Sequence, residues 1–247
     1  MRGLKILLLL LFMSTATVAS YADEETAAKD KKLKDEFEFS LVHTTGNTEV
    51  TTLSAKNTLT YQFTEKWLGE WKIGTLYNES DKNVNAEKYY TDLRLQYDVT
   101  ERFYSYGIGG WLKDRFSGFD GRYYVGPGVG YKFFDGPKHF LAGETGVNYV
   151  HEELTDDSTN DFLEGRLFGK YEYSFTEKNK FSQSLEYLQG LDDKDNYLIN
   201  SETALIAALN SYLALKLSYI VNYNNQPSSD TPDDTDTTLV ASIVVNY

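Results

Sequence analysis

The chain has 247 residues and no cysteine, which excludes disulfides, thiolate metal sites, cysteine nucleophiles and a lipid anchor on cysteine. Outside the N-terminus, no apolar run approaches the roughly 18 residues that a transmembrane helix needs. The mean hydropathy is −0.47, so a helical membrane protein is excluded. A chain this polar can still cross a membrane, but only as a closed β-barrel.

Positive charge is also scarce, with 24 Lys and Arg against 37 Asp and Glu and a net charge of −13. Nucleic acid is therefore not an expected partner, because phosphate binding needs a basic face. Only 4 prolines are present, against 20 tyrosines and 14 phenylalanines. Aromatic residues favour strands and membrane interfaces. Length alone allows one large domain or two small ones.

The N-terminus has the pattern of a secretory signal peptide over residues 1–22. Two basic residues precede the apolar run 6–12, and small residues follow, with cleavage expected after Ala22 or Ala19. An N-terminal membrane anchor is the alternative, but the apolar run is too short to span a bilayer. Residues 23–36 are mostly charged and are expected to form a flexible lead-in, with a short helix as the alternative.

From residue 37 to residue 247, apolar and polar residues alternate in twelve segments, which is the period of a β-strand. Leu93 and Leu95, for example, face one way, and Arg94 faces the other. In the fifth segment the pattern places four apolar residues on the outer face: Tyr104, Tyr106, Ile108 and Leu112. Alternation alone does not separate a membrane barrel from a soluble sandwich or lipocalin-like barrel, whose apolar face points inward.

The connections between segments favour the membrane barrel. One set is short and similar, with Thr-Glu-Lys or Thr-Glu-Arg at 64–66, 100–102 and 176–178. The other set is mostly longer and polar, over residues 78–88, 113–121, 152–161, 192–196 and 225–237. This asymmetry predicts an all-β, transmembrane antiparallel β-barrel of about 12 strands, with short periplasmic turns and longer extracellular loops. Lipid would contact outward positions such as Leu93, Leu215 and Ile243, in the bacterial outer membrane.

Several motifs resemble the salt-induced outer-membrane proteins, a domain-of-unknown-function family of bacterial β-barrels. The resemblance covers nearly the whole chain after the signal peptide. It rests on residues 45–49 (Thr-Gly-Asn-Thr-Glu), 114–120 (Asp-Arg-Phe-Ser-Gly-Phe-Asp), Arg122 with the Gly-x-Gly-x-Gly-Tyr stretch 126–131, and Pro232 with 236–237. The resemblance implies an outer-membrane location and a β-barrel, but no established activity.

Charged residues on the inner face are the main candidate site. They are Lys56, Lys72, Asp92, Arg94, Arg122, Lys132, Glu144, Glu164, Arg166, Lys170, Glu172, Glu186, Glu202 and Lys216, together with Glu38, Glu70 and Asp98. Charges of both signs inside a narrow barrel either pair into a plug that closes the lumen or line a narrow channel for ions or small polar solutes. At the C-terminus, the alternating Ile243, Val245 and Tyr247 form an expected signal for the outer-membrane assembly machinery.

Catalysis is not expected. The three histidines, His43, His139 and His151, lie near strand ends without an obvious nucleophile or orienting partner. The glycines of 126–130 are not followed by a helix, so they do not form a phosphate loop. Instead they would make room for large lumen side chains such as Tyr124 and Trp111. No cofactor motif is present.

The surplus negative charge gathers in the longer connections, in clusters at 152–161, 192–195 and 230–236. These clusters are expected to be solvated loops. The alternative is weak divalent-cation binding that links the loops to lipopolysaccharide phosphates, since oxygen ligands suit Ca²⁺ and Mg²⁺. Outer-membrane lipid and lipopolysaccharide are therefore the expected partners, and the oligomeric state stays open.

Overall fold

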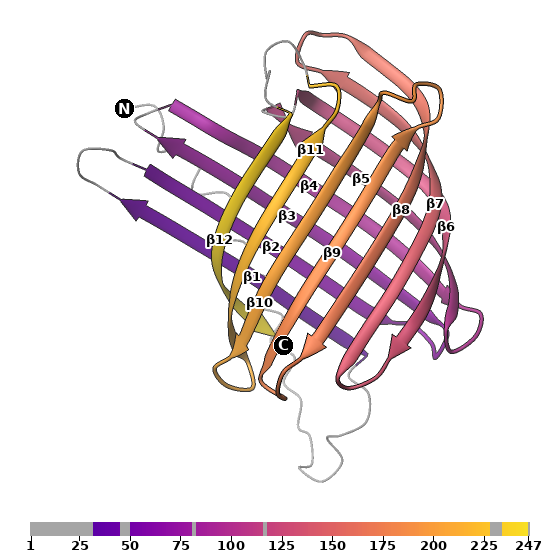
Figure 1. The fold of residues 1–247 in the computed structure, drawn as a ribbon, viewed down its shortest axis with the longest axis vertical. Coiled ribbons are helices and arrows are strands. Elements are labelled where there is room, and N and C mark those ends of the chain that lie inside the picture. Colours follow the sequence, from indigo (N-terminus) through magenta and orange to yellow (C-terminus); the bar gives the residue numbers. More distant parts are fainter. Residues whose placement is uncertain (1–31, 45–49, 81–82, 116–117, 228–233, 247) are drawn as a thin grey trace. The chain divides into compact units, whose positions relative to one another are not determined.

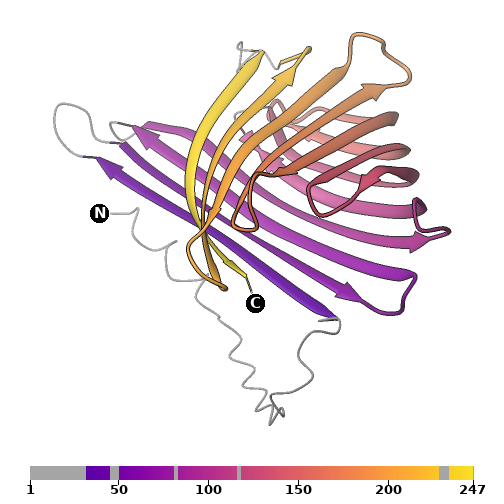
Figure 2. The ribbon, with the colours of Figure 1, turned by 60° about the horizontal axis from the view of Figure 1, so that its bottom comes forward.

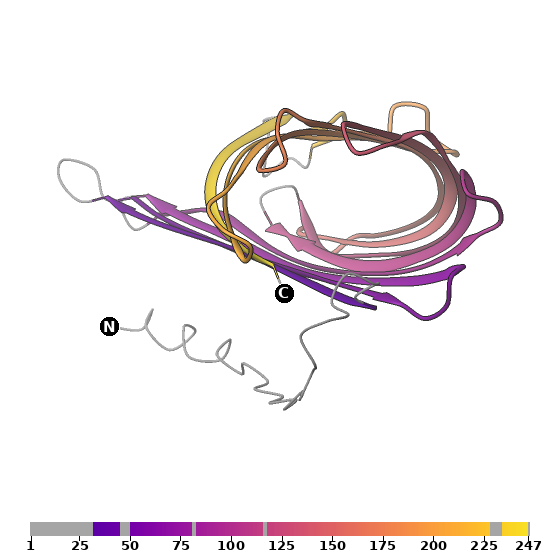
Figure 3. The same ribbon diagram turned by 90° about the horizontal axis from the view of Figure 1, so that it is seen from below.

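Twelve antiparallel strands close into a barrel in a computed structural model, which describes residues 32–44, 50–80, 83–115, 118–227 and 234–246 (Figures 1 and 3). The strands are β1 Leu33–Thr44, β2 Val50–Gln62, β3 Trp67–Ser80, β4 Asn83–Asp98, β5 Phe103–Asp114, β6 Phe119–Asp135, β7 His139–Leu154, β8 Thr159–Ser174, β9 Asn179–Gly190, β10 Tyr197–Ala208, β11 Leu213–Asn224 and β12 Thr235–Asn246. The all-β barrel of about 12 strands is thus confirmed. Within these residues, no helix is long and apolar enough to span a membrane.

The N-terminal boundary of the barrel differs from the prediction. Strand β1 begins at Leu33, so the expected flexible segment was wrong over residues 33–36. Here Glu36 pairs with Asn246 of β12 on one side and with Thr58 of β2 on the other. Lys34 and Glu36 join the sheet because alternate positions of a strand face opposite sides, and the inner side is polar. Asp35 has the opposite orientation and accepts a hydrogen bond from Asn57 at 2.6 Å. The predicted signal peptide, residues 1–22, lies outside the described residues.

The barrel has an apolar outside and a polar inside. Leu93 is 62% exposed and Leu239 is 67% exposed. Arg122 and Glu164, by contrast, are each 3% exposed. A barrel standing in water would reverse this order, because exposing so much apolar surface is unfavourable there. The exposed side chains therefore suit contact with lipid, as the alternation predicts.

Strand β5 is the exception to the predicted faces. Tyr104 and Tyr106 are each 4% exposed and face the lumen, with Ile108 and Leu112 on the same side, so their predicted outward placement was wrong. The outer face of β5 includes two glycines and Trp111, which pairs with the exposed Tyr123. Hydrophobicity misleads here because a tyrosine hydroxyl inside the barrel finds charged partners that lipid does not offer.

Each of three short turns is held by a threonine hydroxyl. The Oγ1 of Thr100 accepts hydrogen bonds from the backbone N–H of Arg102 at 3.3 Å and of Phe103 at 2.8 Å. Thr64 and Thr176 make the same pair of bonds in their turns, and Asn210 uses its side-chain oxygen in the same way. The recurring Thr-Glu-Lys or Thr-Glu-Arg sequence is thus a turn that satisfies two backbone donors. We call the end of the barrel with these turns the turn end, and the opposite end the loop end.

Removing one of these hydroxyls tests the role of the turn. Thr100→Ala is expected to lower the free energy of unfolding by about 1 kcal/mol, because two backbone donors lose their acceptor. Thr100→Ser keeps the hydroxyl and should stay near the wild type. Urea unfolding of the barrel in lipid, followed by tryptophan fluorescence, measures both. Equal losses for alanine and serine would show that the methyl group matters and the hydroxyl does not.

The loop end is built differently from the predicted loops. Strand β3 extends to Ser80, and β4 begins at Asn83. Likewise, β7 extends to Leu154, and β8 begins at Thr159. Most of the predicted loops 78–88 and 152–161 is therefore strand. These hairpins carry the sheet further than the roughly 9–11 residues that cross a bilayer.

The seam between the first and last strands is short. Strands β1 and β12 pair from Glu36–Asn246 to Phe39–Ile243, whereas β1 and β2 pair along the whole of β1. Figures 1 and 2 show β1 and β12 diverging toward the loop end. Among the residues that the structure describes, the cylinder is thus closed by four residue pairs near the turn end.

Candidate functional site in the barrel lumen

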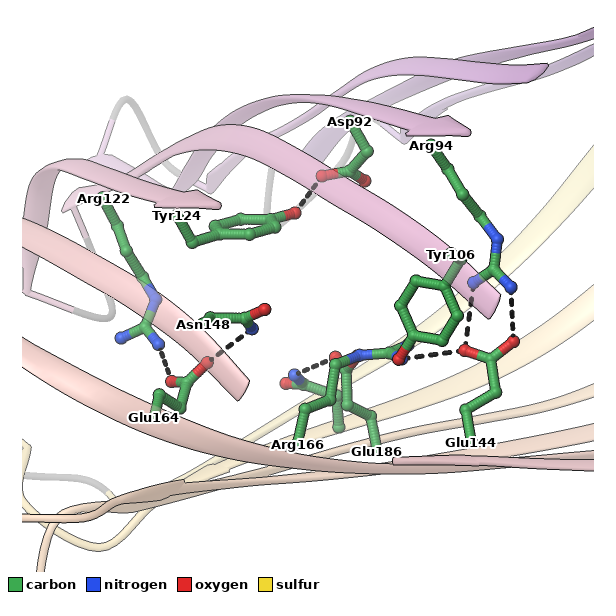
Figure 4. A network of polar contacts seen from close by, with 11 residues as sticks. Asp92, Arg94, Tyr106, Arg122, Tyr124, Glu144, Asn148, Glu164, Arg166 and Glu186 are labelled. Carbon is green, nitrogen blue, oxygen red and sulfur yellow. Dashed lines mark hydrogen bonds and ion pairs between the residues drawn. The ribbon is translucent and has the colours of Figure 1, made fainter. Parts of the chain in front are cut away.

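Charged side chains from strands that are not neighbours in the sheet meet inside the barrel. Arg94 on β4 donates two hydrogen bonds to Glu144 on β7, at 2.7 and 3.0 Å. Strands β5 and β6 lie between these two strands in the sheet, so this ion pair bridges part of the lumen. Figure 4 shows the two side chains pointing toward each other from opposite walls. Such a bidentate Arg–carboxylate pair combines strength with a fixed geometry.

Glu144 is the centre of a larger network (Figure 4). It also accepts hydrogen bonds from Arg166 at 2.8 Å and from the hydroxyl of Tyr104 at 2.9 Å. Arg166 in turn donates to Glu186 at 2.7 Å and to the hydroxyl of Tyr106 at 2.9 Å. We call these residues, with Arg94, the Glu144 network. It joins β4, β5, β7, β8 and β9 from within the barrel.

Arg122 forms a second buried cluster, nearer the loop end. Its guanidinium bonds to both Glu152 on β7 and Glu164 on β8. Asn148 adds a hydrogen bond to Glu164 at 3.2 Å. All four residues are buried, so each charge depends on its partners rather than on water. Arg122 is one of the residues on which the resemblance to the salt-induced proteins rests. In the structure it has two carboxylate partners.

A third cluster lies beside the β1–β12 seam. Glu38 on β1 accepts hydrogen bonds from Lys56 on β2 at 2.7 Å and from Lys216 on β11 at 2.9 Å. Lys216 also pairs with Glu202 at 2.8 Å, and Ser218 donates to the same carboxylate at 2.8 Å. Lys216 reaches past β12 to contact β1. This cluster therefore ties the two edges of the closed sheet together.

The remaining predicted charges lie toward the turn end or stand apart. Lys72 pairs with Glu70 at 2.8 Å, and Glu172 pairs with Lys170 at 2.8 Å. Lys132 lies 3.6 Å from Asp135. Asp92 on β4 accepts a hydrogen bond from the hydroxyl of Tyr124 on β6 (Figure 4) and forms no ion pair with any residue that the structure describes.

Lumen tyrosines lie over glycines of the adjacent strand. Gly128 faces Tyr106 across β5 and β6, and a Cβ added to Gly128 would overlap the tyrosine ring. Gly130 is paired with Tyr104 and Gly110 with Tyr124 in the same way. Packing is therefore the role of Gly128 and Gly130, as predicted, but they make room for Tyr106 and Tyr104, whereas the predicted Tyr124 lies over Gly110 of β5. The predicted lumen role of Trp111 was wrong, since that residue faces outward.

Two glycines on neighbouring strands offer a matched test of this packing. Gly128→Ala is expected to lower the free energy of unfolding by about 1–3 kcal/mol, because the added methyl group displaces the Tyr106 ring. Gly107→Ala adds the same methyl group where nothing lies within 4 Å, so a change within about 0.5 kcal/mol is expected. Urea unfolding in lipid measures both. Equal losses of stability in the two variants would mean that the backbone freedom of glycine, rather than space for the Tyr106 ring, explains the glycine at position 128.

A cavity of about 370 Å³ lies within the loop-end half of the lumen. The wall of the cavity toward the turn end includes Arg166 and Glu186 of the Glu144 network. The wall toward the loop end includes Asn224, at the end of β11, and Asp234, directly before β12. The ion pairs thus narrow the lumen without filling it. Among the lining residues are eight carboxylates and four cationic side chains: Glu38, Asp92, Asp114, Glu164, Glu186, Glu202, Asp234 and Asp236, and Lys56, Lys88, Arg122 and Arg166.

Sequence reasoning missed several members of these clusters. Glu152 was assigned to a solvated acidic loop, yet it is buried against Arg122 on β7. Glu152 has the same parity as Glu144, eight residues earlier in β7. Continuing the alternation from Glu144 would therefore have placed Glu152 on the inner face. Tyr104 and Tyr106 were missed because their strand was given the wrong faces. No signal in the sequence marks Glu144 as the residue that several cations share.

The other predicted positions have local contacts. His139 bonds to Tyr171 at 2.9 Å, and His151 bonds to Asp161 at 2.9 Å, both at exposed sites. Ile243 and Val245 are exposed on the outer face of β12. The side chain of His43 and the whole of Tyr247 lie outside the described residues. In the part of the chain that the structure describes, no group of three or more His, Asp or Glu side chains is arranged to hold a metal ion.

Three solved structures with a similar fold are a porin, an outer-membrane channel and an autotransporter translocator domain. The NanC porin superimposes with a TM-score of 0.52 at 8% identity, covering 86% of this chain and 97% of the porin. An outer-membrane channel from Pseudomonas putida F1 gives 0.51 at 12% identity, covering 87% and 94%. The translocator domain of the autotransporter NalP from Neisseria meningitidis gives 0.50 at 14% identity, covering 90% of each chain. These likenesses show the fold, that of a membrane β-barrel.

The sequence itself has a curated relative and a family. The uncharacterized protein YdiY of Escherichia coli (strain K12) is 29% identical over 228 residues, which are 92% of this chain and 88% of the relative. Residues 37–247 match the family described as "Protein of unknown function, DUF481". This match takes in the whole barrel except the first residues of β1. The chain therefore belongs to the DUF481 family.

Proposed function

We propose that the protein is a narrow outer-membrane channel that admits ions and small polar solutes through its loop end. The observation that carries this proposal is the cavity of about 370 Å³ inside the barrel, which the lumen ion pairs leave open. A porin and an outer-membrane channel among the structurally similar proteins support it at the level of architecture. Channels of this kind select by diameter and by the charges on their walls.

The charges of the cavity predict the preference of the channel. Eight carboxylates against four cationic side chains line the cavity, so cations should be enriched there over anions. Asp92 is notable because its carboxylate accepts a hydrogen bond from a tyrosine hydroxyl and forms no ion pair with any cation in the described part of the chain. Its carboxylate lines the cavity, and its negative charge acts both on the lumen and on Lys72, the residue opposite it on β3.

A second candidate is a non-conducting structural barrel of the envelope. The specific observation in its favour is the Glu144 network, which links five strands across the interior. If this network fills the lumen cross-section below the cavity, no ion passes. The acidic residues at the loop end would then provide the contacts with cations or lipopolysaccharide.

Conductance of the purified barrel in a planar bilayer separates these candidates. We expect small discrete current steps and a reversal potential that favours cations under a KCl gradient. Asp92→Asn should reduce this preference, whereas Gly107→Ala, on the outer face, should not. A heat-dependent gel shift shows that each sample is folded. A folded barrel without current steps would contradict the channel and support the structural barrel.

A further inference from the structure

The cavity wall contains many apolar side chains, which a path for small ions does not require. Six of these residues come from six different strands: Leu76, Leu112, Phe119, Leu188, Ile220 and Val240. A water-filled barrel interior is normally polar. Apolar wall in contact with water is unfavourable, and a ligand with apolar groups would remove that contact.

The same cavity has the features of a cation site. Carboxylates outnumber cationic side chains two to one in its lining, and Asp92 makes no ion pair with a described residue. The aromatic rings of Tyr90, Tyr124 and Phe119 also line it. Aromatic faces attract ammonium groups, and more strongly so where water is excluded. Charge and aromatic lining thus favour a positively charged ligand over an anion.

We propose that this cavity binds organic cations that carry apolar groups, such as alkylammonium compounds. The ligand's charge lies near Asp92, Tyr90 and Tyr124, and its apolar groups contact the aliphatic side chains of the cavity wall nearer the loop end. The volume of about 370 Å³ falls in the range of ordinary small-molecule pockets, about 300–1,000 Å³. This inference rests on the proposed function, because the ligand would enter the cavity through the loop end. It adds the chemical class of the solute to that proposal.

Binding can be measured without any current. The barrel is reconstituted in lipid nanodiscs and titrated by calorimetry with tetrabutylammonium, tetramethylammonium and butanesulfonate, with empty nanodiscs as the blank. Tetrabutylammonium has both charge and apolar groups, tetramethylammonium has mainly charge, and the sulfonate has the opposite charge. We expect saturable binding of tetrabutylammonium, at least about tenfold tighter than that of tetramethylammonium, and none of the sulfonate.

Two variants assign the site. Asp92→Asn removes the charge but keeps a hydrogen-bond acceptor for Tyr124, and Ile220→Asn makes the apolar wall polar. Each should weaken tetrabutylammonium binding by about tenfold, and Gly107→Ala should leave it unchanged. The comparison of the three probes on the unaltered barrel does not depend on whether either variant folds.

The outcomes distinguish this inference from the proposed channel. Equal affinity for the two ammonium ions, binding of the sulfonate, no binding, or wild-type affinity in both folded variants would overturn the inference. A barrel that conducts potassium but shows one of these results is a channel without the organic-cation site. A barrel that binds tetrabutylammonium and carries no current has the site but is not a channel.

Discussion

Replacing Glu144 with alanine is expected to lower the free energy of unfolding by about 3–5 kcal/mol. Its carboxylate accepts hydrogen bonds from Arg94, Arg166 and Tyr104. Removing it leaves two arginines in the lumen without their shared partner, and an uncompensated buried charge costs more than the lost attraction. Urea unfolding of the barrel in lipid, with refolding to show reversibility, measures the loss.

A glutamate in a turn provides the control for this variant. Glu177 is exposed between β8 and β9, so Glu177→Ala should change the free energy of unfolding by less than about 0.5 kcal/mol. The Glu144→Ala barrel should also carry a larger current with a weaker preference for cations, because it has more space and one negative charge fewer. Equal stability of the two variants would show that Glu144 does not hold the network together.

Introducing arginine at Leu93 is expected to destabilise the barrel by about 2–4 kcal/mol. Leu93 is 62% exposed on the outer face of β4. It lies midway between Tyr89 and Tyr97, two aromatic residues of the kind that mark membrane interfaces. An arginine there would place its charge in hydrocarbon, so reversible unfolding in lipid should detect the loss directly.

Val84 offers a control on the same strand. It is also exposed, but it lies nine residues nearer the loop end, at the second residue of β4. Since the cost of a charge falls to about 0–1 kcal/mol near the interface, Val84→Arg should have little effect. Similar losses for both variants would mean that the depth of the charge in the bilayer is irrelevant. The outer face would then not contact a bilayer, contrary to what the exposed leucines indicate.

The fold could be predicted because alternation is a local property. Each residue's neighbours two positions away, such as Leu93 and Leu95, report which face it occupies. The prediction failed in β5, where Gly107 and Gly109 leave the middle of the outer face without side chains and tyrosines turn inward. The short seam between β1 and β12 could not be predicted at all, because alternation fixes faces but not the extent of pairing.

The site was predictable as a set of residues but not as contacts. Arg94 and Glu144 are both assigned to the lumen by alternation, yet they are 50 residues apart in the sequence. Which cation meets which carboxylate depends on strand tilt, register and side-chain length. The apolar part of the cavity wall was hidden for another reason. Ile220, for example, lies between Tyr219 and Val221 in the sequence, so nothing distinguishes it from the apolar residues of the outer face.

The long-range ion pairs also bear on how the protein is made. Glu38 bonds to Lys216 across 178 residues of sequence, so the two charges first meet when β11 is in place. A partly formed sheet would carry this carboxylate and its neighbours into hydrocarbon without partners, at a large cost for each charge. An isolated hairpin also leaves backbone groups unpaired at its edges. Folding and insertion must therefore occur together, with the chain entering the bilayer as a nearly complete cylinder.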